Sequence, residues 1–211
     1  MNHLKLNSFK KGNDFIKFQE GKFEVVFSTA ENNKSFNRNT EEGIKELEAL
    51  IDKFQGENVE YLKQIHSNKV YTYRKGSNDF KDNEGDALIT NEKKVIIGVF
   101  TADCVPVILV DKENEAIAAI HSGWKGTFSS IVTETILRMK EEYNSKAENI
   151  VAYIGPHIRQ CCYEVSEDLK EQFLKKFDIE KDKLFDGRNL SLEECINNDL
   201  INSGVLEENI H

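Results

Sequence analysis

The chain has 211 residues, of which 39% are hydrophobic and 31% are charged, and its formal net charge is -9. These values are typical of a globular protein with one substantial core. Its 28 Lys and Arg residues are dispersed and are outnumbered by 37 Asp and Glu residues, which argues against a nucleic-acid partner. A small anionic substrate stays compatible with this charge, because a local pocket can be basic in an acidic protein.

Apolar runs and cysteines indicate the compartment. No apolar run approaches the roughly 20 residues that span a bilayer, and the first five residues lack the apolar core of a signal peptide. We therefore expect a cytoplasmic protein with no membrane partner. Its four cysteines are Cys104, Cys161, Cys162 and Cys195, and a reducing compartment predicts free thiols. On a strand, adjacent Cys161 and Cys162 would point in opposite directions, which argues against their pairing.

The first quarter of the chain predicts one strand and one helix. Residues 23–27 alternate as a strand does, and residues 31–39 form a polar loop. A helix is expected to begin near Asn39 or Thr40, because Asn39 with Glu42 resembles a capping box. Gly56 is suited to the left-handed turn that ends such a helix.

A series of strands should follow this helix. The expected strands cover residues 59–65, 69–73, 86–90, 95–100, 105–110 and 116–120. The last three are apolar throughout, as in strands buried on both faces. The connection 111–114 is too short for a crossover helix, so its flanking strands are expected to be antiparallel.

Helices dominate the remainder of the chain. The pattern predicts a helix over 127–143, a strand over 150–154, a helix opened by Ser166 and a last helix over 190–202 that stops at Gly204. Strands and helices do not alternate regularly, which disfavours a doubly wound parallel fold. We expect one α+β domain over residues 1–211, a layered sandwich of mixed β-sheets flanked by helices.

Three residues beside apolar runs suggest a metal site. Cys104 follows the run 95–100, His121 follows the run 116–120, and His66 lies in a polar turn upstream. Two imidazoles and one thiolate are a known catalytic zinc ligand set that leaves the fourth position to water or substrate. We therefore expect His66, Cys104 and His121 to converge on a metal ion.

The same residues support a second chemistry. Cys104 and His121 can form a thiolate–imidazolium pair, with Asp103 or Asp86 orienting the ring. The two roles of Cys104 exclude each other, because coordination quenches its nucleophilicity. A buried cysteine that only packs is the third interpretation.

Two further segments can bind an anionic substrate group. The turn 122–127 combines glycines with a helix start, and Lys125 and Gly126 are its expected binding residues. A tight strand-to-helix turn that needs glycine only for its geometry explains the same pattern. His157 and Arg159, after the strand 150–154, can bind a phosphate or carboxylate. Cys161 and Cys162 are either extra ligands or packing residues.

Five motifs in order resemble the laccase-domain family. They are Gln64-Ile65-His66, Gly85-Asp86-Ala87-Leu88, Thr101-Ala102-Asp103-Cys104-Val105-Pro106, His121-Ser122-Gly123-Trp124-Lys125-Gly126, and Ile154-Gly155-Pro156 with Cys162-Tyr163-Glu164-Val165. Members have been called polyphenol oxidases, purine nucleoside phosphorylases and peptidoglycan editing factors. The resemblance implies a single-domain sandwich and a metal held by His66, Cys104 and His121, with zinc expected and copper as the alternative ion.

The resemblance also implies a function. It favours a zinc-dependent purine nucleoside-processing enzyme that binds small molecules, a nucleoside and phosphate. Its reactions would be phosphorolysis of adenosine, inosine or methylthioadenosine, and deamination of adenosine. Asp103 and Asp86 are the two candidates for donating a proton to the leaving base. The alternatives are a cysteine-dependent amidase that edits cytoplasmic peptidoglycan precursors, and a metal-stabilised binding protein without turnover.

Several positions depart from the family pattern. Thr29-Ala30-Glu31-Asn32 stands where Thr-Arg and two glycines are usual, and Lys125 replaces a common arginine, which keeps the charge without the bidentate fork. The chain ends at His211, before the usual C-terminal strand. A multicopper oxidase needs a blue-copper site and a trinuclear cluster rich in histidine. With five histidines, two of them near the chain ends, this sequence does not support a laccase mechanism.

Overall fold

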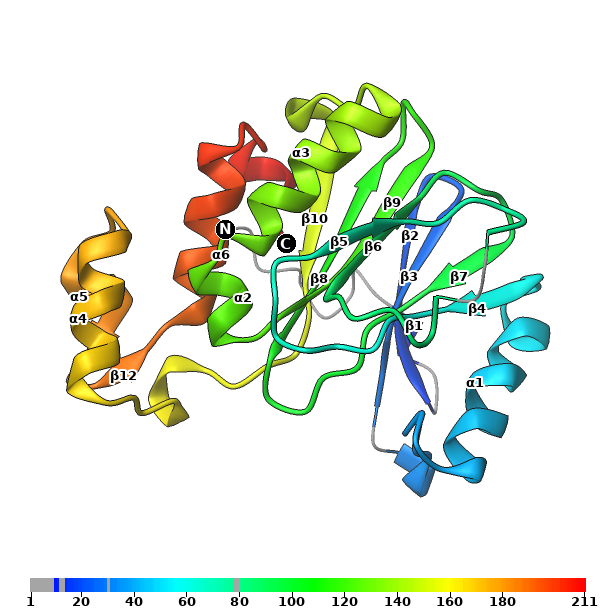
Figure 1. The fold of residues 1–211 in the computed structure, drawn as a ribbon, viewed down its shortest axis with the longest axis horizontal. Helices are drawn as coiled ribbons and strands as arrows, with labels where there is room; N and C mark the ends of the chain where they lie inside the picture. Colours follow the sequence, from blue (N-terminus) through cyan, green and yellow to red (C-terminus); the bar gives the residue numbers. More distant parts are fainter. Residues whose placement is uncertain (1–9, 12–13, 30, 78–79) are drawn as a thin grey trace.

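The computed structural model describes residues 10–11, 14–29, 31–77 and 80–211 (Figure 1). The N-terminal five residues and Ala30, both used in the sequence interpretation, lie outside the described residues. Within these ranges, no helix has the length and the apolar character needed to cross a membrane.

A five-stranded mixed sheet forms the centre of the molecule. Its strands, in spatial order, are β10 (Ile150–Ile154), β8 (Val105–Asp111), β9 (Ala116–Ser122), β6 (Ala87–Thr90) and β5 (Val70–Thr72). Only β5 and β6 pair in parallel. The antiparallel β8–β9 pair confirms the expectation from its short connection. The Asp111 carboxylate stabilises that turn by accepting hydrogen bonds from the backbone N–H groups of Glu113 and Asn114.

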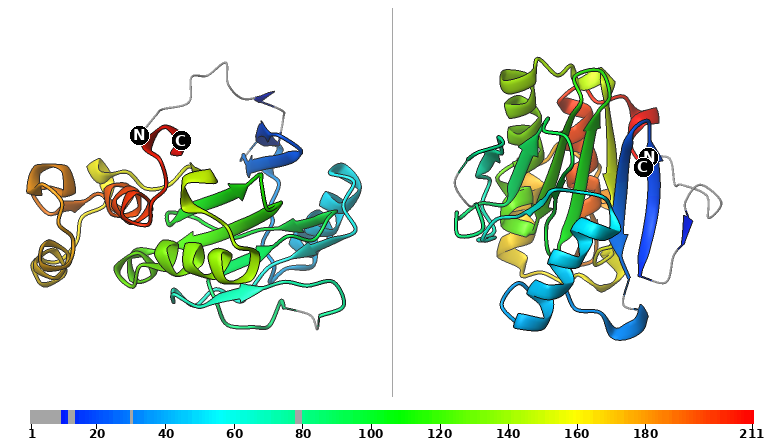
Figure 2. Two further views of the ribbon diagram at one scale, coloured as in Figure 1. Left: turned by 90° about the horizontal axis from the view of Figure 1, so that it is seen from above. Right: turned by 90° about the vertical axis from the view of Figure 1, so that its right-hand side faces the viewer.

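Smaller sheets cover one face of the central sheet. An antiparallel sheet contains β1 (Lys10–Lys11), β2 (Phe15–Glu20) and β3 (Phe23–Ser28), and a parallel pair contains β4 (Asn58–Glu60) and β7 (Val95–Ile97). Val25 of β3 packs with Val110, Val151 and Tyr153. Figure 2 shows the blue β2–β3 hairpin on one side of the green strands and α3 on the other.

Helices cover the opposite face. The α-helices are α1 (Glu41–Lys53), α2 (Trp124–Phe128), α3 (Ile131–Tyr143), α4 (Glu167–Lys176), α5 (Lys181–Leu184) and α6 (Leu192–Asn202), of which α2 to α6 contribute to the larger core. In β8, Val107 and Leu109 face that core, while Val110 belongs to the opposite cluster. Burial of side chains such as Leu109 and Phe173, both 0% exposed, contributes roughly 1.5–3 kcal/mol each.

Short elements complete the chain. They are the 3-10 turns η2 (Glu31–Asn33), η3 (Ala147–Asn149), η4 (Gln160–Cys162) and η5 (Glu207–Asn209), and the two-residue strands β11 (Phe185–Asp186) and β12 (Asn189–Leu190). Ile210 forms a parallel bridge with Ala152, so the described chain end lies along β10. Together the layers confirm the expected α+β sandwich of mixed sheets flanked by helices.

Helix ends differ in detail from the sequence expectation. Thr40, and not Asn39, caps α1, because its hydroxyl accepts a hydrogen bond from the Gly43 N–H at 3.1 Å. After α1, Gln55 takes the left-handed conformation (φ 53°). The expectation that Gly56 adopts the left-handed conformation is therefore wrong. The predicted N-cap of α4 is confirmed, because the side chain of Ser166 accepts a hydrogen bond from the Leu169 N–H.

Two differences affect the site directly. The expected helix 127–143 is divided into α2 and α3, because Ser130 adopts a left-handed conformation (φ 55°) between them. The expected strand 95–100 ends at Ile97 and pairs with β4, outside the central sheet. Residues 98–104 are therefore a loop, and this loop carries Cys104 to the start of β8.

Candidate functional site

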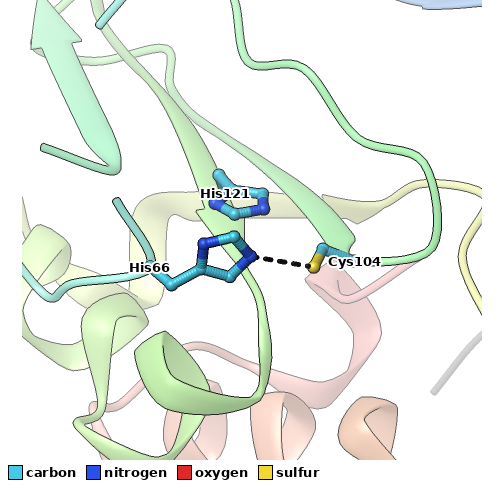
Figure 3. A group of neighbouring side chains, drawn as sticks. All are labelled: His66, Cys104 and His121. Atoms are coloured by element: carbon cyan, nitrogen blue, oxygen red, sulfur yellow. Dashed lines mark hydrogen bonds between the residues drawn. The ribbon is translucent and has the colours of Figure 1, made fainter. Parts of the chain in front are cut away.

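His66, Cys104 and His121 converge at one end of the central sheet (Figure 3). Cys104 immediately precedes β8, and His121 is the sixth residue of the paired strand β9, where it lies opposite Pro106. His66 comes from the loop before β5. Its Nε2 lies 3.8 Å from the Cys104 Sγ, and one ligand atom from each residue lies within 4.8 Å of the others. The structure therefore brings together the three residues predicted from the sequence.

The Asp86 carboxylate organises this group. Its Oδ1 lies 2.8 Å from the His121 Nδ1 and accepts a hydrogen bond from the His66 N–H at 2.9 Å. Its Oδ2 accepts hydrogen bonds from the Ser67 N–H at 2.6 Å and the Ser67 hydroxyl at 2.7 Å. The same carboxylate thus holds the loop of His66, whose φ is 60°, and orients the ring of His121. Asp86 is fully buried beneath these neighbours, and proton donation by its carboxylate stays a prediction.

The pKa values follow from these contacts. Burial raises the pKa of Asp86, but hydrogen bonds from His121 and Ser67 outweigh it and bring the pKa down to about 2. Burial lowers the pKa of His121, whereas its contacts with Asp86 and Cys104 raise it, with a net value of about 9. The site thus has an ionised carboxylate at its back, which compensates the positive charge of a protonated His121 or of a bound cation.

The ligand set fits a transition-metal ion. A tetrahedral ion at about 2.0–2.1 Å from nitrogen and about 2.3 Å from sulfur holds these atoms about 3.3–3.6 Å apart. The observed 3.8 Å between Cys104 and His66 is close to that spacing. The contact of the His121 Nδ1 with Asp86 leaves its Nε2 for coordination, and such a carboxylate behind a histidine ligand is common in metal sites.

Gly123 and Gly126 permit the close approach of the surrounding backbone. A Cβ at Gly123 would lie 2.7 Å from the His66 Cδ2 and 3.0 Å from the Cys104 Sγ. A Cβ at Gly126 would lie 3.2 Å from the Ser67 carbonyl oxygen. The glycines in the turn before and within α2 therefore have a steric reason, and anion binding by this turn stays a prediction.

The other predicted site residues lie around this centre. Lys125 is exposed. The pKa of His66 is lowered mainly by burial, then by the charge of the nearby His121, and to a smaller extent by the charge of Lys125. Asp103 is also exposed, and its carbonyl oxygen accepts a hydrogen bond from the Ile158 N–H at 2.9 Å. This bond joins the Cys104 loop to the segment that contains His157 and Arg159.

His157 and Arg159 both contact a buried carboxylate. The His157 Nδ1 lies 2.7 Å from the Gly155 carbonyl oxygen and its Nε2 lies 3.6 Å from Glu193. A guanidinium nitrogen of Arg159 lies 2.8 Å from the same Glu193, although more than half of the arginine side chain is exposed. Arg159 is thus the more accessible of the two, and substrate binding by either residue stays a prediction.

The sequence interpretation missed two residues that support the site. The Gln64 amide accepts a hydrogen bond from the Phe100 N–H and donates one to the Phe100 carbonyl, both at 2.7 Å. Tyr163 lies near Cys104: burial raises the pKa of its hydroxyl, and the charge of Cys104 raises it further. The position of Gln64, two residues before His66, was a usable signal. Tyr163 lies in the motif Cys162-Tyr163-Glu164-Val165, but its approach to Cys104 depends on the tertiary fold and could not be predicted from the motif.

The same geometry also places Cys104, His121 and Asp86 in the order nucleophile, base and orienting carboxylate. The Asp86–His121 contact is formed at 2.8 Å, and Cys104 is half-buried beside the ring. This is the arrangement that activates a nucleophile. Metal coordination and nucleophilic attack would thus use the same two side chains, Cys104 and His121.

Fold and site together define a layered α+β protein with a His–Cys–His centre. The chain belongs to the family described as multi-copper polyphenol oxidoreductase laccase, whose sequence profile matches residues 18–211. In the described part of the chain, His66, Cys104 and His121 are the one group of three or more His, Cys, Asp or Glu side chains gathered closely enough to hold an ion.

Two proteins similar in sequence to this chain are named as purine nucleoside phosphorylases. A purine nucleoside phosphorylase of Clostridium acetobutylicum is 46% identical over 182 residues, which cover 86% of this chain and 76% of the relative. A purine nucleoside phosphorylase of Aquifex aeolicus is 42% identical over 134 residues, covering 63% and 62% of the two chains. These relatives support an enzyme.

Solved structures confirm the fold. The Bacillus licheniformis protein YfiH superposes with a TM-score of 0.84 over 97% of this chain and 87% of its own, at 20% identity. The Neisseria meningitidis protein NMB0706 superposes with a TM-score of 0.77 over 91% and 84% of the two chains, at 25% identity.

Proposed function

We propose that the protein is a zinc-dependent purine nucleoside phosphorylase that cleaves adenosine, inosine or methylthioadenosine. The observation that carries the proposal is the convergence of two imidazoles and one thiolate in front of a buried carboxylate. Three protein ligands are the pattern of catalytic zinc sites, which keep a fourth position for water or substrate. The relatives named purine nucleoside phosphorylase support the substrate class.

The residues divide into ligands, a positioning residue and charged groups. His66, Cys104 and His121 would hold the ion, which would act as a Lewis acid toward an oxygen of water or phosphate. Asp86 fixes the ring of His121 and the backbone of His66. Lys125 and Arg159 supply positive charge for phosphate, and exposed Asp103 is the proposed proton donor to the leaving base.

Phosphorolysis exchanges one bond for another. The bond between the ribose C1′ and the purine nitrogen breaks, a bond between C1′ and a phosphate oxygen forms, and the leaving base takes up a proton. Adenosine deamination, proposed at the same centre, instead places water on the purine ring and releases ammonia. The two reactions give different products from adenosine, namely adenine and inosine.

The test is a product assay on purified protein with adenosine or inosine, with and without phosphate. We expect phosphate-dependent release of the free base and ribose 1-phosphate, and loss of this activity with a chelator and with Cys104→Ala. Cys161→Ser is the matched control, because it removes a thiol outside the ligand group and should keep activity under reducing conditions. Full activity of Cys104→Ala in protein without stoichiometric metal would refute the proposal.

A cysteine-dependent amidase is the second candidate, favoured by the Asp86–His121 contact beside Cys104. Its substrate would be a misplaced amino acid in a cytoplasmic peptidoglycan precursor, cleaved through an acyl-enzyme on the Cys104 sulfur. This candidate predicts amide hydrolysis that survives the chelator and stops on alkylation of Cys104. The response to chelator therefore separates the two functions.

A further inference from the structure

Two adjacent cysteines outside the ligand group lie in contact. Cys161 and Cys162 form the end of η4, and their sulfur atoms are 3.3 Å apart. The expectation that adjacent cysteines diverge holds for a strand. Here a 3-10 turn replaces the strand, closed by the hydrogen bond from the Cys162 N–H to the Arg159 carbonyl oxygen at 2.9 Å. The turn brings the two side chains to the same side of the backbone.

Both thiols are open to solvent, unlike the other cysteine outside the ligand group. Cys161 and Cys162 are exposed, whereas Cys195 is completely buried in the helix-side core. The hydrogen bond to Cys161 raises the pKa of the Cys162 thiol, which agrees with direct contact between the two groups. An exposed thiol with a second thiol in contact is the arrangement in which oxidation of one cysteine is resolved to a disulfide by its neighbour.

We propose that Cys161 and Cys162 are a vicinal dithiol, a modification site that small-molecule disulfides oxidise reversibly to a disulfide between the two residues. One thiolate attacks the small disulfide, forms a mixed disulfide and releases the first small thiolate. The second thiolate then attacks the sulfur of its neighbour and releases the second. Two protein thiols and one small disulfide thus give one protein disulfide and two small thiols, which carry the two protons.

The covalent geometry indicates that this disulfide is easily reduced. Neighbouring Cα atoms are about 3.8 Å apart, which is less than the roughly 4.4–6.8 Å usual for disulfides. The ring that joins adjacent residues is therefore strained, and strained exposed disulfides are the labile ones. The pair is suited to reversible oxidation and not to a structural crosslink.

Trypsin separates the cysteines cleanly, which makes the proposal testable on the full, metal-loaded chain. Cleavage after Arg159 and Lys170 gives peptide 160–170 with Cys161 and Cys162 alone. Cys104 falls in peptide 95–112, and Cys195 falls in peptide 189–211. After incubation with oxidised glutathione and alkylation of free thiols, we expect peptide 160–170 to have lost two hydrogens, and excess reduced glutathione to restore both thiols.

Single serine variants test the cooperation of the pair. In Cys161→Ser and Cys162→Ser the remaining thiol has no partner, so a stable glutathione adduct should accumulate in place of the disulfide. Both positions are exposed, so both variants should melt at the wild-type temperature. Formation of the internal disulfide supports the proposal whatever happens at Cys104. A stable adduct, two adducts or unreacted thiols on wild-type peptide 160–170 would overturn it.

Discussion

At the scale of single residues, Asp86 is the side chain on which the candidate centre depends most. It contacts the ring of His121 and accepts hydrogen bonds from the backbone of His66 and from both donors of Ser67. Asp86→Asn removes the negative charge and turns one acceptor into a donor. We predict a 10–100-fold loss of metal affinity, measured by competition with a chromogenic chelator. Asp103→Asn, which changes an exposed carboxylate nearby, should retain the wild-type affinity.

Gly123 has an equally local role. An alanine Cβ would meet the His66 ring at 2.7 Å and the Cys104 sulfur at 3.0 Å, so the two ligands must move apart. Gly123→Ala should lower metal affinity at least about tenfold, since catalytic geometry tolerates only small displacements. Gly98→Ala is the control, because its Cβ would have no neighbour within 4 Å. Equal affinity of the two variants would show that the ligand positions do not depend on this contact.

At the scale of elements, Gln64 ties the His66 loop to the loop that delivers Cys104. Phe100 lies beyond the end of β7, and the Gln64 amide satisfies both of its backbone groups in place of a strand partner. Gln64→Leu leaves both groups without this partner. We predict a free energy of unfolding lower by about 1–3 kcal/mol, measured by urea denaturation with chelator present, and weaker metal binding without chelator. Gln172→Leu, on the exposed face of α4, should change neither quantity.

At the scale of the whole molecule, Asp199 on α6 makes stability depend on pH. Burial raises its pKa from 3.8 to about 6, although Lys176 and a hydrogen bond with Ser130 oppose this. Because the folded state binds this proton more tightly, the contribution to stability is complete below pH 3.8 and is lost as the pH rises through about 6.

Asp199→Asn should therefore unfold at a higher urea concentration than wild type at pH 8. The gain is about 2–3 kcal/mol for a pKa shift of this size, and it should disappear near pH 4. Urea denaturation at the two pH values measures the difference. Exposed Asp82→Asn should show no such pH-dependent gain, and a gain of the same size at both pH values would contradict the titration of Asp199.

Much of the fold and three of the site residues could be predicted from local patterns. The apolar runs of β8 and β9, the short turn between them and the Ser166 cap of α4 depend on neighbours in sequence. Since soft and borderline ligands next to buried strands are uncommon, Cys104 and His121 were recognisable as a site. The left-handed residue after α1, the break at Ser130 and the early end of β7 could not be predicted in this way, because tertiary packing overrides local propensity there.

The sequence by itself determined the layered α+β class, the family and the identity of the three candidate ligands. Only the tertiary structure decided that Asp86 organises them and that Gln64 fixes the Cys104 loop. The physical reason is the separation along the sequence of the residues that interact. Hydrophobic periodicity and capping act within a few residues, whereas hydrogen bonds to buried carboxylates and contacts between loops join positions 20 to 36 residues apart, whose meeting depends on the complete fold.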